Sequence, residues 1–442
     1  MNARPPVSAR HVALDALVRI DDGAFAHILV PEALRGSGLS ARDRALVTEL
    51  VYGTVRMQRT LDALLAALSS RKLATLDAPV RAALRLGAYQ LFVGIPAHAA
   101  VGETVSLVDA RARGFVNGVL RSLARHGPPF SLPVGESVAA VGMRTSHPDW
   151  IVRTLFEAFG PADAIATLEL DNKPPSITLR VNRSRATSGD LAGELAAAGV
   201  DVTRGELVGD ALLLRHSGDP AALPAIADGR ATPQDQASQA VVAVLDPQPG
   251  ERVLDLAAAP GGKATGAAER VGAGGLVVAA DLHSGRVRTV RRAASRLDLL
   301  DVVAPVVADG RHLPVREMSF DRVLLDAPCS GLGVLRRRPD ARWRVQESDV
   351  HDLAALQRTL LAAAAGAVRA GGRLVYSVCT LTREETLGVD DWATEHLPAF
   401  VAASPPARPW RPHGRGAILL PSDAGTDGMF VLALTRRDVA SA

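Results

Sequence analysis

From about residue 236 onward, apolar runs alternate with segments of helical length. The runs are RVLDLAA, GLVVAADL, DVVAPVVAD, DRVLLDAP and GRLVYSVCT. Strands that alternate with helices form parallel sheets with helices packed on their faces. The sequence therefore predicts a doubly wound, mainly parallel α/β sheet over residues 236–442. A closing hairpin, AILLPSDAGTDGMFVLALTRR, fits the antiparallel edge that such sheets often carry.

The 442-residue length alone predicts two to four domains. The residues before 236 show other sequence patterns than this alternation. Residues 1–130 are predicted to form an all-helical domain, because apolar residues recur there at helical spacing. The Pro-, Gly- and Ser-containing stretch HGPPFSLPVGES is a linker. Short strands and a helix over residues 140–235 then predict a small α+β domain.

Charge is concentrated near the start of the chain. Residues 1–130 carry 16 Arg and Lys against 10 Asp and Glu, whereas the net charge of the whole chain is only +3. A basic helical module joined to a near-neutral domain fits an RNA-binding module attached to a catalytic one. On charge alone, an arginine-rich solvated surface explains the pattern equally well.

The chain shows no sign of a membrane partner. No apolar run reaches the ~20 residues that a membrane span requires, and the start MNARPPVSARHVALDAL has no apolar signal core. We therefore expect a cytoplasmic protein with no membrane contact. No heptad pattern or exposed pairing strand is evident, so we expect a monomer.

A glycine-containing turn follows the first strand of the predicted sheet. In DLAAAPGGK, adjacent glycines let a ligand approach the backbone, and the following helix N-terminus offers N–H groups to an anion. Lys263 is one of only three lysines in the chain. Asp281 ends the second strand, where it can accept hydrogen bonds from ribose hydroxyls, and Asp309 ends the third, near an adenine amino group. Each aspartate alone is more often a cap or turn residue.

The chain has two cysteines, and both follow predicted strands. Cys329 lies in LLDAPCSGLG after the fourth strand, together with Asp326, and Cys379 lies in VYSVCTL after the fifth. Two thiols cannot build a structural zinc site. A buried inert thiol is the usual alternative for each cysteine. If the fourth and fifth strands are neighbours, both thiols and Asp326 face one crevice beside the glycine turn.

This arrangement suits methylation at C5 of a pyrimidine. A thiolate that adds at C6 converts the ring to an enamine and makes C5 reactive toward a methyl sulfonium. A carboxylic acid near N3 and N4 stabilises the charge that builds on the ring, and Asp326 is the candidate.

Three motifs, DLAAAPGGK, DAPCSGLGVLRRRPD and YSVCT, together resemble the RNA 5-methylcytosine methyltransferase family that uses two cysteines. The helical segment is similar to the NusB-like RNA-binding domain, a combination found in the 16S ribosomal RNA cytosine-C5 methyltransferase B (Sun or Fmu) branch. The resemblance implies a Rossmann-like class I methyltransferase domain, S-adenosyl-L-methionine as cofactor and 16S ribosomal RNA as substrate.

The resemblance also implies residue roles. Cys379 matches the family's nucleophile, Cys329 the thiol implicated in release of methylated RNA, and Asp326 the aspartate that contacts the base. Lys263 matches a loop lysine near the active centre. The implied cofactor-binding residues are Ala257, Ala258, Ala259, Pro260, Gly261, Gly262, Lys263, Asp281, Asp309 and Asp326.

Ala257 departs from the family, which often has cysteine in its place. We interpret the change as harmless, because that cysteine is not the nucleophile. The resemblance also suggests that Arg180 and Asn182 contact RNA, although a surface strand would explain them nearly as well.

Other functions remain open at this point. The same chemistry on transfer RNA or another ribosomal site is one alternative, and a non-catalytic RNA-binding assembly factor is another. A generic amino- or oxygen-methyltransferase is the weakest, because it has no need for two thiols at the ends of adjacent strands.

Overall fold

The computed structural model describes residues 8–215 and 220–438. The described residues form two compact units. The first runs up to Lys173 and includes the short segment Leu335–Arg344; the second contains Pro174–Val334 and the residues from Val345 onward.

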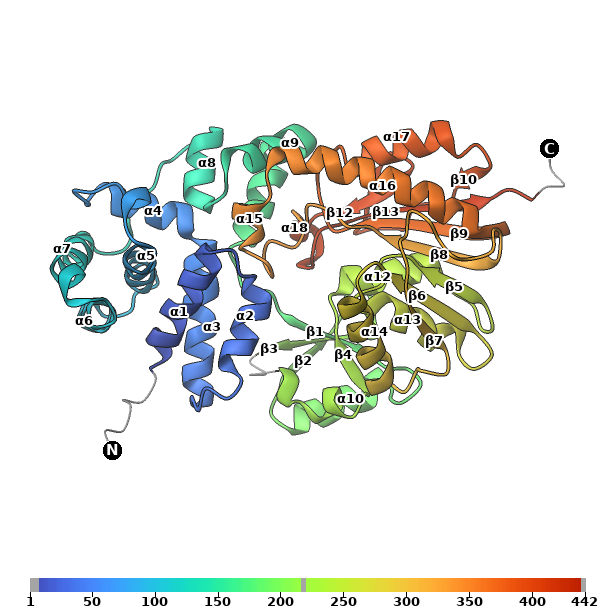
Figure 1. Cartoon of the computed structure of the whole chain (residues 1–442), viewed down its shortest axis with the longest axis horizontal. Helices are drawn as coiled ribbons and strands as arrows, with labels where there is room; N and C mark the ends of the chain where they lie inside the picture. Colours follow the sequence, from blue (N-terminus) through green and yellow to red (C-terminus); the bar gives the residue numbers. More distant parts are fainter. Residues whose placement is uncertain (1–7, 216–219, 439–442) are drawn as a thin grey trace. The chain divides into compact units, whose positions relative to one another are not determined.

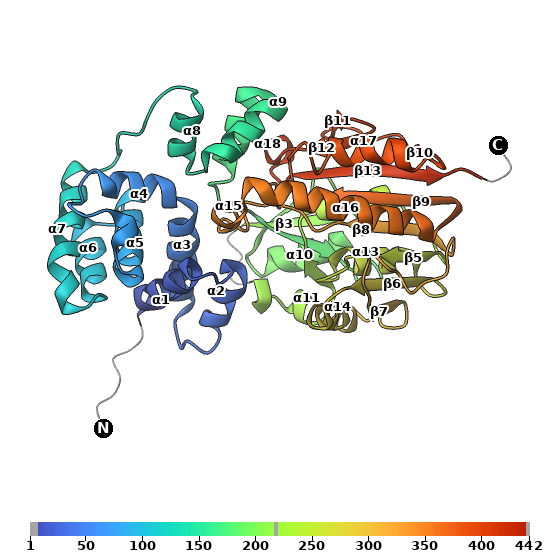
Figure 2. The same ribbon diagram turned by 45° about the horizontal axis from the view of Figure 1, so that its top comes forward.

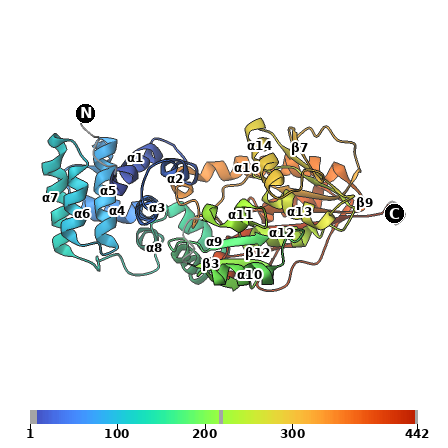
Figure 3. The same cartoon turned by 90° about the horizontal axis from the view of Figure 1, so that it is seen from below.

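The described residues of the first unit form helices joined by turns and loops, with no strand among them. Its helices, in chain order, are α1 (Ala9–Asp21), α2 (Ala26–Leu34), α3 (Ala41–Arg56), α4 (Gln58–Ala66), the 3₁₀ turn η1 (Leu73–Thr75), α5 (Ala78–Phe92), α6 (Ala97–Ser106), α7 (Ala110–His126), α8 (Val138–Thr145), α9 (Asp149–Leu170) and α15 (Ala341–Arg344). Serine side chains accept hydrogen bonds from backbone N–H groups at the starts of α1 and α3, which satisfies otherwise unpaired donors. In Figure 3, α5, α6 and α7 lie side by side, and they contact one another.

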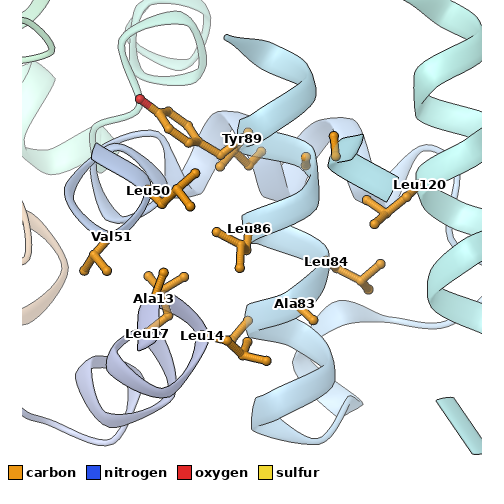
Figure 4. Packing of buried hydrophobic residues seen from close by; sticks show 14 of the residues in the cluster. Ala13, Leu14, Leu17, Leu50, Val51, Ala83, Leu84, Leu86, Tyr89 and Leu120 are labelled. Atoms are coloured by element: carbon orange, nitrogen blue, oxygen red, sulfur yellow. The ribbon is translucent and has the colours of Figure 1, made fainter. Parts of the chain in front are cut away.

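Helix α5 is the centre of this bundle. Its apolar side chains pack against those of α1, α3 and α7, and Leu50, Leu86 and Leu120 are fully buried (Figure 4). Gly53 in α3 is required by this packing. A Cβ at that position would lie 2.0 Å from the ring of Tyr89, so only glycine lets α3 and α5 approach so closely.

The segment Leu335–Arg344 is part of the helical unit, although it lies between two strands of the other unit in the sequence. Arg342 is fully buried and donates hydrogen bonds to the carbonyl oxygens of Arg56 and Ser146 and to Oδ1 of Asn172. Burial lowers the pKa of Arg342 to about 9. The side chain therefore ties together three stretches of the helical unit.

The second unit begins with a small antiparallel sheet. Its strands are β1 (Ile177–Val181), β2 (Asp201–Arg204), β3 (Ala211–Arg215) and β4 (Ala231–Pro233), in the order β2-β3-β1-β4. Helix α10 (Ser188–Ala197) packs on this sheet, and Leu191 and Leu195 fill its core with Leu179 and Leu212. The turn η2 (Pro220–Ala222) and helix α11 (Pro224–Ala227) lead into β4.

A larger sheet follows. Its strands are β5 (Arg252–Asp255), β6 (Leu276–Asp281), β7 (Val303–Val307), β8 (Phe320–Asp326), β9 (Val368–Val378), β10 (Phe400–Ala402), β11 (Arg411–His413), β12 (Gly416–Leu419) and β13 (Met429–Arg436). In the described residues the order is β11-β12-β13-β9-β8-β5-β6-β7, and β10 pairs with β13. The five strands from β9 to β7 in this order are parallel, and β13 pairs with β9 in the antiparallel sense.

Helices cover both faces of the large sheet (Figures 1 and 2). Along one face lie α12 (Gln236–Leu245), α13 (Gly262–Val271) and α14 (Ser284–Arg296), and along the other α16 (Glu347–Ala367) and α17 (Leu387–His396). A short helix, α18 (Pro421–Ala424), connects β12 to β13. The strands read as continuous apolar runs because both faces are buried.

The predicted fold class is confirmed: a helical region, a small α+β sheet and a doubly wound sheet follow one another. The closing hairpin is antiparallel as predicted, but β13 lies inside the sheet and β11 forms its edge. The predicted division into three domains remains a prediction, with its boundaries at residues 1–130, 140–235 and 236–442. The compact units divide differently, because α8 and α9 pack with the helical unit. No helix in the described ranges is long and apolar enough to cross a membrane.

Candidate active site

Acidic and thiol side chains gather where the parallel strands end. Asp255, Asp281 and Asp326 are the last residues of β5, β6 and β8. Cys379 directly follows β9, which pairs with β8. Ligands of open α/β sheets bind at this carboxyl edge, so the topology brings the predicted residues to the expected place.

The two thiols meet across the ends of β8 and β9. Sγ of Cys329 lies 3.4 Å from Sγ of Cys379, and the two cysteines form a hydrogen bond and not a disulfide. The hydrogen bond to Cys379, burial, and the negative charges of Glu385 and Asp326 raise the pKa of Cys329 well above its usual value. Cys329 is therefore held as a neutral thiol.

Beside the thiols, Lys263 and Asp326 form an ion pair. Nζ of Lys263 lies 2.7 Å from Oδ2 of Asp326, and the hydroxyl of Ser377 donates to Oδ1 of the same carboxylate at 2.8 Å. Burial lowers the pKa of Lys263, but the charge and hydrogen bond of Asp326, with a further contribution from Cys379, raise it overall. Lys263 is thus a largely buried cation whose positive charge is stabilised by Asp326 and Cys379.

Asp255 is a member of this cluster whose role we did not predict. It is only 1% exposed and interacts electrostatically with both Asp326 and Lys263. Burial, reinforced by the charge of Asp326, raises the pKa of Asp255 to about 8. Asp255 is therefore neutral at pH 7, which leaves Asp326 as the charged partner of Lys263.

We expect Asp255→Asn to gain stability relative to the wild type as pH rises. Between an ordinary aspartate pKa of about 4 and the folded value of about 8, the unfolded wild-type chain has lost a proton that the folded chain keeps. Wild-type stability therefore falls through this window, and asparagine removes the effect. The difference in unfolding free energy should grow by up to about 1.4 kcal/mol per pH unit. Urea denaturation across the window measures it, and a constant difference would contradict the expectation.

The predicted glycine turn connects β5 to α13. Gly261 has a φ of +106°, and a Cβ there would lie 3.2 Å from Cα of Val290. Both the backbone conformation and the close contact therefore disfavour any residue other than glycine. Among the described residues no side chain caps α13, which leaves its first N–H groups facing outward from the turn. The turn thus offers a close backbone approach and donors for an anionic group.

The two predicted cofactor aspartates border the turn. Oδ2 of Asp281 accepts a hydrogen bond from the N–H of Ala259 at 3.3 Å and lies 3.2 Å from Nε of Arg286. Asp309 lies two residues beyond β7 and pairs with Arg311 at 2.7 Å. Hydrogen bonds from the Arg311 side chain and backbone lower the pKa of Asp309 to about 2. With the turn, these acceptors fit a ligand that carries a carboxylate, ribose hydroxyls and an adenine amino group.

Arg180 and Asn182, for which we predicted RNA contact, are buried instead. Arg180 is 8% exposed and donates to Thr265 Oγ1 at 2.9 Å, to Glu269 Oε1 at 2.8 Å and to the carbonyl of Gly262. Asn182 is fully buried and donates to the carbonyls of Gly229 and Leu297. That prediction is therefore wrong: β1 packs beside α13, and the two side chains satisfy buried polar groups there.

We expect Arg180→Ala to destabilise the second unit by about 3–5 kcal/mol, because it leaves the buried carboxylate of Glu269 without its cation. The matched control is Arg183→Ala, which breaks the solvent-exposed pair with Asp210 and should cost less than about 1 kcal/mol. Urea denaturation measures both. Equal losses would show that Arg180 does not support α13 through its charge.

Sequence reasoning also missed Glu385 and Ser377. Glu385 is fully buried and hydrogen-bonds to Ser330, the residue after Cys329. The signal available was TREET, a pair of acidic residues shortly after the second cysteine. Nothing in such a pattern distinguishes a buried carboxylate from a solvated one.

Comparison with known families is consistent with this geometry. Residues 242–435 match the family described as 16S rRNA methyltransferase RsmB/F. Residues 7–125 match the NusB family, and residues 147–219 match the ferredoxin-like domain of RsmF/B-like methyltransferases.

Similar proteins extend the match along the chain. The probable ribosomal RNA small subunit methyltransferase B of Bacillus subtilis is 35% identical, over 97% of this chain and 99% of the relative. The ribosomal RNA small subunit methyltransferase B of Pseudomonas putida is 37% identical, over 93% and 97%. The crystal structure of PH0851 has a TM-score of 0.83 at 27% identity, over 98% of this chain and 99% of that one. A methyltransferase homolog from Pyrococcus horikoshii has a TM-score of 0.60 at 28% identity, over 69% and 100%.

Proposed function

Because this chain belongs to the RsmB/F family of 16S rRNA methyltransferases, we propose that it methylates C5 of a cytosine in 16S ribosomal RNA through a covalent bond to Cys379. The observation that carries the proposal is the 3.4 Å approach of Cys329 to Cys379 beside the Lys263–Asp326 ion pair. Addition to the ring requires only one thiol, that of Cys379. The neutral thiol of Cys329 is suited to exchange a proton when the methylated RNA is released.

The proposed reaction begins with Cys379. Its thiolate bonds to C6, and the electrons of the C5–C6 double bond shift into the ring, which makes C5 nucleophilic. The Asp326 carboxylate accepts a hydrogen bond from the N4 amino group and so orients the base. Lys263 holds Asp326 in place, and its positive charge stabilises the negative charge that develops on the ring. When bound, S-adenosyl-L-methionine supplies an electrophilic methyl group. A base then takes the C5 proton, the C5–C6 double bond re-forms, and the C6–S bond breaks to return the Cys379 thiolate.

The cofactor would be held by residues of the turn and the adjoining strand ends. The backbone of residues 257–263 approaches the methionine part, where the uncapped start of α13 offers N–H donors. Asp281 accepts from the ribose hydroxyls and Asp309 from the adenine amino group. Arg286 and Arg311, which pair with these carboxylates, must then release acceptor positions to the ligand.

The proposal is tested with methyl-labelled cofactor and unmodified 16S RNA, followed by digestion and identification of the labelled nucleoside. Label in 5-methylcytidine supports both reaction and substrate. Label in transfer RNA but not in 16S RNA would keep the chemistry and overturn the substrate. No label anywhere, together with no cofactor binding by calorimetry, would favour a non-catalytic assembly factor.

We further propose that the protein acts as a cytoplasmic monomer on RNA, with the NusB-like region as an RNA-binding module. The net charge of +6 over residues 1–130 supports the last point. Sedimentation with and without RNA tests the oligomeric state, and a stable dimer would overturn it.

A further inference from the structure

The side chain of Glu385 accepts four hydrogen bonds, which come from three different residues. Oε1 accepts from the backbone N–H of Ser330 and from Nε2 of Gln357, each at 2.9 Å. Oε2 accepts from the hydroxyls of Ser330 and of Thr382, the latter at 2.8 Å. The backbone N–H of Ser330 and the amide of Gln357 can only donate, so Oε1 must be an unprotonated acceptor, and the two hydroxyls surround Oε2.

The donors connect the two thiol loops. Ser330 directly follows Cys329, and Thr380 directly follows Cys379. Oγ of Ser330 lies 2.6 Å from Oγ1 of Thr380. Either hydroxyl can donate in this contact. A hydrogen-bonded chain therefore runs from the residue after Cys379, through the residue after Cys329, to Glu385.

The surroundings make this carboxylate rigid. Gln357 on α16 also donates to the carbonyl of Pro328 at 2.8 Å, so it fixes the residue that directly precedes Cys329. The hydroxyl of Tyr376 lies 2.9 Å from Oε1 of Gln357 and 2.7 Å from the carbonyl oxygen of Glu385, and its single proton is shared between these two acceptors. Glu385, Gln357 and Tyr376 are all fully buried.

Cys379 depends less on this network than Cys329 does. It directly follows the long central strand β9, and its carbonyl accepts from the N–H of Gly333 at 3.0 Å. Cys329 lies three residues beyond β8 in a loop, where the groups next to it are fixed by Glu385 and Gln357. Loss of the Glu385 carboxylate should therefore displace Cys329 first.

We infer that Glu385 is a positioning residue that holds Cys329 beside Cys379 and thereby sets the rate at which methylated RNA is released. The inference rests on the proposed function, in which Cys329 acts at release. Glu385 touches neither substrate nor cofactor in this scheme and acts only through the loop of Cys329.

The test separates formation of the protein–RNA adduct from its release. Glu385→Gln keeps the shape of the side chain but replaces one acceptor oxygen by a donor. With unmodified 16S RNA and cofactor, we expect adduct formation to change less than about 3-fold and release to slow about 100-fold, the effect of a misplaced catalytic group. Adduct is followed on denaturing gels in single-turnover time courses. General destabilisation would reduce both steps alike.

Three variants complete the design. Glu384→Gln makes the same substitution one position earlier and should leave both rates unchanged. Ser330→Ala deletes one hydroxyl, should slow release about 10-fold, and carries the test if Glu385→Gln does not fold. Cys329→Ala reports on the proposed function itself. If Cys329→Ala accumulates adduct but Glu385→Gln or, in its place, Ser330→Ala releases RNA at the wild-type rate, the role of Glu385 is overturned alone. If Cys329→Ala accumulates no adduct, the role of Cys329 at release in the proposed function fails, and the inference about Glu385 falls with it.

Discussion

Cys379→Ala is expected to lower methyl transfer by at least about 10³-fold, because alanine removes the nucleophile without which C5 is not activated. The effect should appear in single-turnover transfer of labelled methyl groups to unmodified 16S RNA. Cofactor binding by calorimetry should be unchanged, since Cys379 belongs to the thiol pair and not to the turn before α13. Full activity in this variant would eliminate the covalent mechanism.

Cys379 is the expected nucleophile from the family resemblance, and the charged groups beside the two thiols agree with this assignment. Lys263 and Cys379 interact favourably when both are charged, whereas Glu385 and Asp326 disfavour charge on Cys329. The neighbouring cation lowers the cost of a thiolate on Cys379. Cys329→Ala is the matched control, because it removes a thiol 3.4 Å away and should still allow adduct formation.

Cys329→Ala is expected to trap a covalent protein–RNA complex. Addition, methylation and loss of the C5 proton are separate steps, and the second thiol is proposed to act at release. We expect most of the enzyme to remain bound to RNA after one turnover, with multiple-turnover methylation reduced at least about 100-fold. Denaturing electrophoresis measures the trapped complex, which should appear as a band that contains both protein and RNA. This band should disappear in the double variant Cys329→Ala, Cys379→Ala.

Rapid turnover by Cys329→Ala without accumulation of adduct would remove Cys329 from the reaction. The short distance between the thiols would then be a packing contact. Addition of a small exogenous thiol serves as a further check, because it should restore part of the release in the trapped complex if a thiol is the missing group.

Much of the candidate site could be predicted from short sequence patterns. Each parallel strand of the large sheet is an apolar run that has an acidic residue or a thiol at its end or within two residues beyond it. In a doubly wound sheet the carboxyl ends share one edge, so residues such as Asp281 and Cys379 are brought there by topology alone. The family resemblance then supplied roles that spacing does not contain, including that of Cys329.

Other features depended on contacts between distant parts of the chain. Arg180 resembles a surface arginine in TLRVN, yet it ends beside Glu269, 89 residues later. Arg342 follows the Cys329 loop in sequence but is buried in the helical unit, against Arg56. Glu385 is one of two adjacent glutamates, and only one of the two turns inward to Ser330.

The physical reason is the same in each case. Apolar periodicity and turn chemistry act over a few residues, so the sequence by itself determined the strands, the helices and the order in which the reactive groups reach the sheet edge. A buried charge is stable only when partners satisfy it, and those partners come from anywhere in the chain. Only the tertiary structure could decide which arginines and glutamates are buried, and hence which of them hold the site together.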